Sequence, residues 1–495
     1  MSSPSEAVPK RTKLQNGGLI AGFLLLIAIL LIPTAPTLTS AGHRMIAILF
    51  FSIVIWMTSA VSYPVSATMI TALTAMLLGT SPDMANPAKL MGTKNALSLA
   101  ISGYSNTAWA LVAAAMFISV AMTKTGLDRR IAISVLSKVG TKVSRIYIGV
   151  IATGFILSFF VPSSTARLAC LIPIILGIIE NLGVNKHSRF ASLLVIGAAQ
   201  ADTLWNIMVQ TAAAQNLIAV GFINSQLHTH ISWLNWLLAA APFSLIMVVI
   251  YYFLSLKLIK PEFSELPGGK EQIQRMKDAM GPMSFDEKKL LTISIILLGF
   301  WATGGKLHSF DTSTTTIVAI ALFFMPGIGI MDWKFAQPRI GWGSIVMFGV
   351  GISLGTALLK TKAALWLADA FINAFSLDQA GALALIAIIA AFLILIHLGF
   401  ASATALAAAM IPIVISIFQR VALPGIDAAA ATMILQFSVC FGFILPVNSP
   451  QGMVAYSSDT FEVKDFIKTG VPITIIGYIL LVVMAATYWH WLGYV

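Results

Sequence analysis

A short apolar segment occurs twice in the chain, and its two copies limit how the chain can fold. The first copy reads SSTARLACLIPI, from Ser163 to Ile174, and the second reads SATALAAAMIPI, from Ser402 to Ile413. Seven of the twelve aligned positions are identical. Each copy places small hydroxyl side chains at the start of a helix inside an apolar stretch. We therefore expect two related halves, each with a polar break at the same place.

The apolar surroundings of both copies extend over most of the chain. Hydrophobic residues make up 58% of the 495 residues, charged residues only 10%, and the mean hydropathy is +0.90. A soluble protein of this length could not bury so much apolar surface, whereas a bilayer requires it. We predict an all-α polytopic membrane protein with about eleven transmembrane helices and two re-entrant hairpins. A β-barrel would show alternating apolar and polar residues, which are not visible.

The net charge of +11 is interpreted as the charge of cytoplasmic loops, and no nucleic-acid partner is expected. A first apolar run follows the basic residues Lys10, Arg11 and Lys13. This pattern predicts an uncleaved first span with its N-terminus in the cytoplasm. The expected location is the plasma (inner) membrane. Cys170 and Cys440 lie in apolar segments, so neither a disulfide framework nor a metal site is expected.

Apolar runs separated by polar residues predict the membrane spans. They cover 18–34, 44–61, 63–80, 106–123, 188–209, 231–257, 290–304, 312–330, 341–359, 427–446 and 468–490. The longest polar segment, 260–289, reads as a cytoplasmic linker between the halves. The expected parts are a tail (1–17), two sets of scaffold helices with an interfacial segment (18–144 and 290–377), the linker (259–289) and two transport parts with a hairpin (145–258 and 378–495).

Two long apolar segments are interrupted in the middle. The first, 146–182, breaks at Val161–Ser163, and the second, 379–420, breaks near Ser402. Each arm is too short for an ordinary span in this interpretation, so both segments are predicted to be re-entrant hairpins. Amphipathic segments at 128–145 and 360–377 precede them and are expected to lie at the membrane interface.

The hairpin tips carry the candidate binding groups. A helix that starts inside the membrane has free backbone N–H groups and a partial positive charge at its first turn, which favours an anion. Ser163, Ser164 and Thr165 can donate hydroxyls from one tip, and Ser402 and Thr404 from the other. Such a pair suits a small ligand with a carboxylate at each end. These residues could instead only cap their helices, but two matching copies favour a site.

Two basic groups lie beside these tips. Arg167 is one turn into the first motif helix, and its planar fork suits a carboxylate. An intramembrane arginine needs a partner, and the alternative is a fixed pair with Asp202. His397 lies just before the second break and is either a ligand-binding group or a helix-packing residue.

A further break follows each hairpin. Gln215 and Asn216 lie in the sequence QTAAAQN, and Asn448, Ser449 and Pro450 lie in LPVNSPQG. Unwound helices of this kind expose carbonyls and amides and line ligand sites. The alternatives are an ordinary proline kink or a loop end at the membrane surface.

Together these motifs resemble the divalent anion/sodium symporter family, which carries di- and tricarboxylates. That family has two Ser-Asn-Thr motifs at its hairpin tips, which correspond here to Ser163-Ser164-Thr165 and Ser402-Ala403-Thr404, and LPVNSPQG is similar to its signature after the second hairpin. The resemblance covers about 45 to the C-terminus. It implies a homodimer, a scaffold and a moving transport domain, an elevator motion, and substrate contact by both motifs.

This chain departs from the sodium-coupled members at both motif asparagines, which are Ser164 and Ala403 here. The sequence PSSTAR is closer to that of the family's exchangers of citrate, succinate, tartrate, 2-oxoglutarate and malate. In that reading Arg167 and His397 supply the positive charge that sodium supplies elsewhere. An empty carrier with a fixed unpaired charge would cross the membrane poorly, so sodium-independent dicarboxylate exchange is favoured over sodium symport.

Two other classes stay open at this point. An intramembrane hydrolase would need Ser163 hydrogen-bonded to His397 and an oxyanion hole. A channel would need a continuous pore lined by repeated rings. Neither explains the duplicated tips, so the expected protein is a transporter and not an enzyme, with no cofactor. The sequence does not specify the preferred dicarboxylate.

Overall fold

The structure, a computed structural model, describes residues 12–181, 183–265, 269–421, 423 and 425–495. These residues form helices joined by turns, and β pairing among them is limited to isolated bridges. The predicted all-α architecture is confirmed. Lys10 and Arg11 of the predicted tail, and Pro267 and Gly268 of the predicted linker, lie outside the described residues.

The first half of the chain consists of helices on both sides of the first motif. These are α1 (Lys13–Leu31), α2 (Ser40–Met57), α3 (Tyr63–Gly79), α4 (Thr93–Ala100), α5 (Thr107–Thr125), α6 (Leu127–Leu136), α7 (Val143–Phe160), α8 (Ser164–Asn181), α9 (Arg189–Met208), α10 (Ala214–Gln226) and α11 (Trp233–Leu258).

The second half repeats the order of elements seen from α5 onward. It consists of α12 (Gly269–Asp278), α13 (Phe285–Thr303), α14 (Thr312–Phe324), α15 (Trp333–Ala336), α16 (Trp342–Lys360), α17 (Ala363–Phe375), α18 (Ala382–His397), α19 (Ala403–Val421), α20 (Ala428–Val439), α21 (Pro450–Tyr456), α22 (Val463–Ala486) and α23 (Tyr488–Trp491). A long helix, a short helix, a helical hairpin, a broken helix and another long helix follow one another in α5–α11 and again in α16–α22. This agrees with two related halves.

Local chemistry explains both hairpin breaks. Pro162 disfavours a helical conformation in the residue before it, and α7 ends at Phe160. The Ser163 hydroxyl accepts a hydrogen bond from Ala166 N (3.3 Å) at the start of α8. The Ser402 hydroxyl accepts one from Ala405 N (3.3 Å) at the start of α19. The predicted break positions are confirmed.

The hairpin arms are longer than the sequence suggested. α7 and α8 each have 18 residues and α19 has 19, and all three are among the nine described helices that are long and apolar enough to cross a membrane. The prediction that each arm is too short for a span was wrong for these three arms, because so few residues are lost to the turn. The fourth arm, α18, has 16 residues and is not among the nine. The first interfacial segment, predicted over 128–145, is also shorter and ends as a helix at Leu136.

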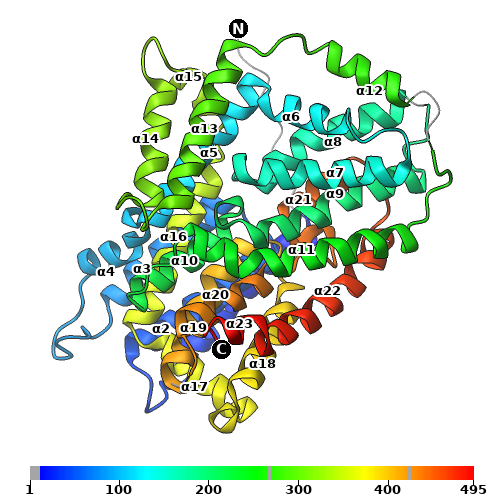
Figure 1. Cartoon of the computed structure of the whole chain (residues 1–495). Coiled ribbons are helices and arrows are strands. Elements are labelled where there is room, and N and C mark those ends of the chain that lie inside the picture. The colour runs from blue at the N-terminus through cyan, green and yellow to red at the C-terminus, as the bar shows by residue number, and fades with distance from the viewer. Residues whose placement is uncertain (1–11, 182, 266–268, 422, 424) are drawn as a thin grey trace.

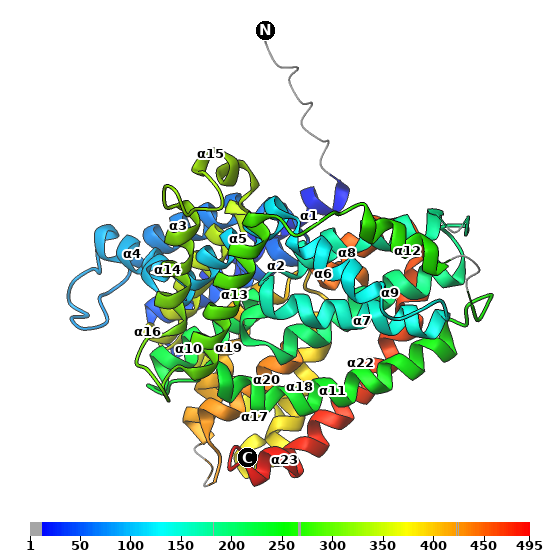
Figure 2. The ribbon, with the colours of Figure 1, turned by 45° about the horizontal axis from the view of Figure 1, so that its top comes forward.

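The helices pack into one body with two distinct faces. α12 and α15 lie on one face, and α17 and α23 lie on the opposite face (Figures 1 and 2). α5 packs against α14, while α9 packs against α7 and α11. Large apolar side chains point outward from several helices, as at Leu24 on α1 and Phe253 on α11. Such an apolar exterior is what a bilayer requires.

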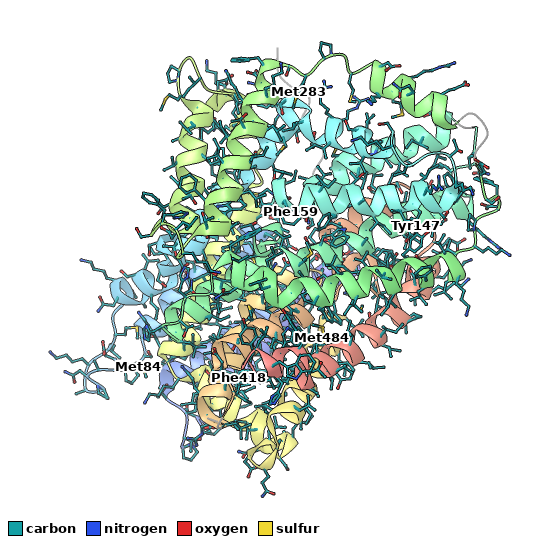
Figure 3. The ribbon with its side chains drawn as sticks, viewed as in Figure 1. Met84, Tyr147, Phe159, Met283, Phe418 and Met484 are labelled. Carbon is teal, nitrogen blue, oxygen red and sulfur yellow. The ribbon has the colours of Figure 1, made fainter. Side chains whose placement is uncertain are left out.

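Side chains fill the spaces between the helices (Figure 3). Tyr147 of α7 is fully buried, stacks on Tyr252 of α11, and shares a hydrogen bond of 2.8 Å with Ser255. A buried tyrosine hydroxyl needs such a partner. The contact holds the first hairpin against the long helix that follows it.

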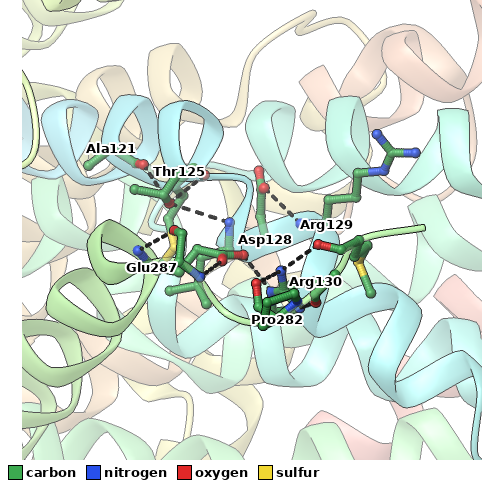
Figure 4. Close-up of polar contacts among 12 residues, drawn as sticks. Ala121, Thr125, Asp128, Arg129, Arg130, Pro282 and Glu287 are labelled. Carbon is green, nitrogen blue, oxygen red and sulfur yellow. Dashed lines mark hydrogen bonds and ion pairs between the residues drawn. The ribbon is translucent and has the colours of Figure 1, made fainter. Parts of the chain in front are cut away.

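One arginine ties the short helix α6 to the segment that joins the two halves (Figure 4). The Arg130 Nε donates to the Glu287 carboxylate at 2.5 Å. Its two terminal nitrogens donate to the carbonyls of Met280, Gly281 and Pro282. Glu287 in turn completes a capping box with Ser284 at the start of α13. The arginine therefore fixes the end of the linker to α6.

The neighbouring acid has a different environment. Asp128 is buried and accepts a hydrogen bond from Arg129 N. Burial raises the pKa of its carboxyl above the ordinary value. The Arg129 side chain points away from Arg130 (Figure 4), so it offers a matched control for the tie made by Arg130.

We predict that Arg130→Ala lowers the apparent melting temperature in detergent. The substitution removes hydrogen bonds to a charged group and leaves the Glu287 carboxylate without its partner, a loss of about 1.5–3 kcal/mol. Arg129→Ala, which removes the same charge from an exposed position, should melt close to wild type. Equal melting temperatures for Arg130→Ala and wild type would contradict the assigned tie.

Candidate functional site

A cavity of about 550 Å³ lies between the two hairpin tips and the helices α5 and α16. Ser163 and Thr165 line it from the first motif, and Ser402 and Thr404 line it from the second. These are identical positions of the two copies. Ser164 also lines the cavity. Segments more than 200 residues apart therefore supply matching hydroxyls to one space, which sequence spacing alone could not place.

Several helices begin at this cavity. α8, α10 and α19 start beside it, at Ser164, Ala214 and Ala403. Pro450, the first residue of α21, also lines it. The first N–H groups of a helix lack intrahelical acceptors and carry partial positive charge. The starts of the longer helices α8, α10 and α19 around one space make it a favourable environment for an anion.

The motif hydroxyls both cap helices and face the cavity. Ser163 and Ser402 accept the capping bonds described above, which uses their oxygen and not their proton. Within the described residues these two hydroxyls donate no hydrogen bond, and those of Ser164, Thr165 and Thr404 form none. Hydroxyl donors are therefore available to a carboxylate at both tips, so capping and ligand binding are compatible.

Arg167 is placed away from the cavity, in a buried network. It is 1% exposed, and its Nε and Nη2 donate to the two Asp202 carboxylate oxygens at 2.6 and 3.0 Å. Nη1 donates to the carbonyls of Val161 (2.6 Å) and Ala212 (3.1 Å), and Nη2 also donates to Asn206. The alternative considered from the sequence, a fixed pair with Asp202, is the arrangement observed.

His397 also lies outside the cavity lining. Its Nε2 is 3.1 Å from the carbonyl oxygen of Asn448, so that nitrogen carries the proton. Its Nδ1 is buried without a hydrogen-bond partner among the described residues. Ser163 is not among its partners, so the contact that a hydrolase would need is not formed.

The other predicted residues divide between cavity and core. Gln215 and Pro450 line the cavity. Asn216 is buried and donates to the Asn206 and Val209 carbonyls. Ala403, Asn448 and Ser449 are buried and are not among the lining residues. Asn448 donates from its amide to the carbonyls of His397, Leu398 and Phe400.

Sequence reasoning missed the polar groups that line the cavity from outside the hairpins. Ser119 and Thr123 of α5 line the cavity, together with Tyr63, Ser344 and Arg339. The Ser119 hydroxyl is buried and has no hydrogen-bond partner among the described residues. The spacing of Ser119 and Thr123 by four residues in an apolar helix was the available signal. No cluster of three or more metal-ligating side chains occurs in the described part of the chain.

The fold and this cavity define a membrane transporter: an apolar helical body with paired hairpins whose tips meet at one polar site. A family profile described as the sodium:sulfate symporter transmembrane region matches residues 13–495. The chain belongs to this family, the divalent anion/sodium symporters, and the resemblance inferred from the motifs is confirmed. The family and the similar proteins are transporters and not enzymes.

Similar proteins show the range within the family. A membrane protein of Cupriavidus necator is 53% identical, covering 99% of this chain and 95% of its own. An L-tartrate/succinate antiporter of Escherichia coli is 27% identical over 88% of both chains. The sodium-dependent dicarboxylate transporter SdcS of Staphylococcus saprophyticus is 24% identical, covering 94% of this chain and 90% of its own.

A similar fold is found in a solved structure, that of the Alcanivorax borkumensis YdaH transporter. It has a TM-score of 0.54 at 16% identity and covers 86% of this chain and 97% of its own. At that identity the likeness concerns the fold alone.

We predict that Arg167→Ala strongly destabilises the protein, because it leaves the Asp202 carboxylate buried without a counter-ion. Breaking such a pair costs about 3–5 kcal/mol. Adding Asp202→Asn should restore part of the lost melting temperature by removing that charge. The measurement is thermal melting of the single and double variants in detergent, and a double variant no more stable than Arg167→Ala would argue against the pair.

Proposed function

We propose that this protein is a sodium-independent dicarboxylate transporter that works by exchange. The observation that supports it most directly is the cavity, where matching hydroxyls from both motifs and three helix starts surround one space. A ligand with a carboxylate at each end can accept from one tip with one end and from the other tip with the second. Ser119 of α5 also lines the cavity, with its hydroxyl oxygen buried.

Sodium independence is supported by the hydrogen bonds that backbone carbonyls at the helix breaks already accept. Carbonyls of unwound helices coordinate cations in many transporters. Here the carbonyls of Val161 and Ala212, one at each break of the first half, accept from the Arg167 guanidinium. The Asn448 carbonyl pairs with the His397 ring. Fixed donors thus occupy acceptors that a sodium ion would otherwise use.

The Arg167–Asp202 pair removes the unpaired charge on which exchange was expected to depend. An empty carrier was expected to hold an unpaired positive charge, but Asp202 neutralises Arg167 in the structure. The case for exchange therefore comes from the similarity to an L-tartrate/succinate antiporter, together with the Ser164 and Ala403 replacements. The second candidate is sodium symport, favoured by the similarity to a sodium-dependent dicarboxylate transporter.

We further propose that the chain divides into a fixed and a moving part in the membrane. The helices before each hairpin (18–144 and 290–377) act as a scaffold, and the parts with the hairpins (145–258 and 378–495) move as a transport domain. The motion is of the elevator type, and the hairpins are re-entrant. The protein is a homodimer in the inner membrane. Its N-terminus lies in the cytoplasm, because basic residues such as Lys257, Lys260 and Lys289 gather around the linker.

Counterflow in proteoliposomes tests the proposed exchange. We expect labelled succinate to enter vesicles preloaded with unlabelled dicarboxylate, equally with sodium or potassium outside, and to enter empty vesicles poorly. Vesicles without protein are the control. Rapid uptake into empty vesicles driven by a sodium gradient would establish sodium symport instead.

The motif hydroxyls should contribute to affinity and not to folding. Ser163→Ala, Thr165→Ala, Ser402→Ala and Thr404→Ala should each weaken dicarboxylate binding by about 1.5–3 kcal/mol, the value of a hydrogen bond to a charged group. Ser416→Ala is a matched control, since Ser416 lies on α19 but bonds only the Pro412 carbonyl. If all four variants bind dicarboxylate like wild type, these hydroxyls only cap helices.

A further inference from the structure

Arg339 contributes a charge to the cavity lining from a segment outside the two hairpins. It ends the short turn between α15 and α16 and lines the cavity together with Ser344 and Met347 of α16. Among the described residues that line this cavity it is the one with a permanent charge, and there is no aspartate or glutamate among them. An anion in the cavity therefore meets one cation and no opposing acid.

A second cation accompanies Arg339 on the same aromatic ring. The Arg339 guanidinium carbon lies 3.9 Å from the centroid of the Phe335 ring, and Lys124 Nζ lies 4.9 Å from it. Arg339 Nη1 donates to the Phe335 carbonyl at 2.9 Å. Neither cation forms an ion pair within the described residues.

The nearby acid is already engaged. The Asp332 carboxylate accepts a hydrogen bond from Phe335 N at 2.9 Å as the cap of α15. Two like charges on one ring repel each other, whereas the ring attracts both. A bound anion would relieve this repulsion, and Arg339 keeps N–H donors that are not used by Phe335.

Arg339 follows a helix that lies on one face of the molecule. Thr123 near the end of α5 and Gly341 at the start of α16 also line the cavity. The preceding helix α15 lies on the face that also carries α12 (Figure 2). Arg339 is exposed, whereas Ser163 is half-buried and Ser402 is buried.

We propose that Arg339 is a binding residue for a dicarboxylate that enters from this face, and that it receives one carboxylate before both are bound at the hairpin tips. The inference rests on the proposed transport of dicarboxylates and adds a side-specific contact to it. A positive group at a cavity entrance raises the local concentration and capture rate of an anion, and salt weakens the effect. The neighbouring Lys124 strengthens the field without lining the cavity.

The test is succinate exchange in right-side-out and inside-out membrane vesicles that contain the full-length protein. We expect Arg339→Gln to raise the half-saturating external succinate concentration about ten-fold in one vesicle orientation, with little change in the other. Arg339→Lys should fall between Arg339→Gln and wild type, because it keeps the charge but not the planar fork. Lys334→Gln is the matched control: it removes an equal charge from α15 at an exposed position outside the cavity.

The ionic-strength dependence provides a second readout. Salt should raise the half-saturating concentration of wild type more than that of Arg339→Gln, in the same vesicle orientation only. A shift of equal size in both orientations, or none in either, would overturn the inference. A wild-type protein that exchanges no dicarboxylate would instead overturn the proposed function, so the two failures are distinguishable. Melting temperatures of the variants identify any loss of folding.

Discussion

The buried Arg167 guanidinium is the interaction on which the first half of the structure depends. It connects the hairpin turn at Val161, the helix α9 at Asp202 and Asn206, and the second break at Ala212. Unwound backbone at membrane depth is tolerated only when its polar groups are satisfied. A single side chain with five donors does this for carbonyls at both breaks, and Asp202 compensates its charge.

The second half solves the same problem with a neutral group. Leu406 stands at the position that corresponds to Arg167 in the aligned motifs. Here the Asn448 amide donates to the carbonyls of His397, Leu398 and Phe400 at the hairpin turn. Each hairpin is therefore fixed by one side chain that satisfies its open carbonyls, although the residue type and its origin in the chain differ. The repeats share a geometry without sharing the chemistry that holds it.

This arrangement separates support from binding. Charged and amide side chains form hydrogen bonds within the buried networks next to the tips. The tips themselves present hydroxyls and helix N–H groups to the cavity. Neutral donors at both ends suit a doubly charged anion, since they bind it without leaving a net positive charge when it departs. The cation that does line the cavity, Arg339, belongs to the turn before α16 and not to the hairpins.

The sequence by itself determined the class, the order of elements and the location of both breaks, because apolar run length, proline and hydroxyl caps act over a few residues. It also selected Ser163, Thr165, Ser402 and Thr404, which line one cavity, because a repeated motif singles out matching positions. It could not decide what Arg167 binds, since a carboxylate of the substrate and Asp202 are equally compatible with the pattern. Only the tertiary structure placed α9 beside α8, which gave Arg167 a protein partner, and brought α5 and Arg339 to the same cavity as the tips. Those contacts depend on how helices distant in sequence pack, and local sequence propensity does not encode this packing.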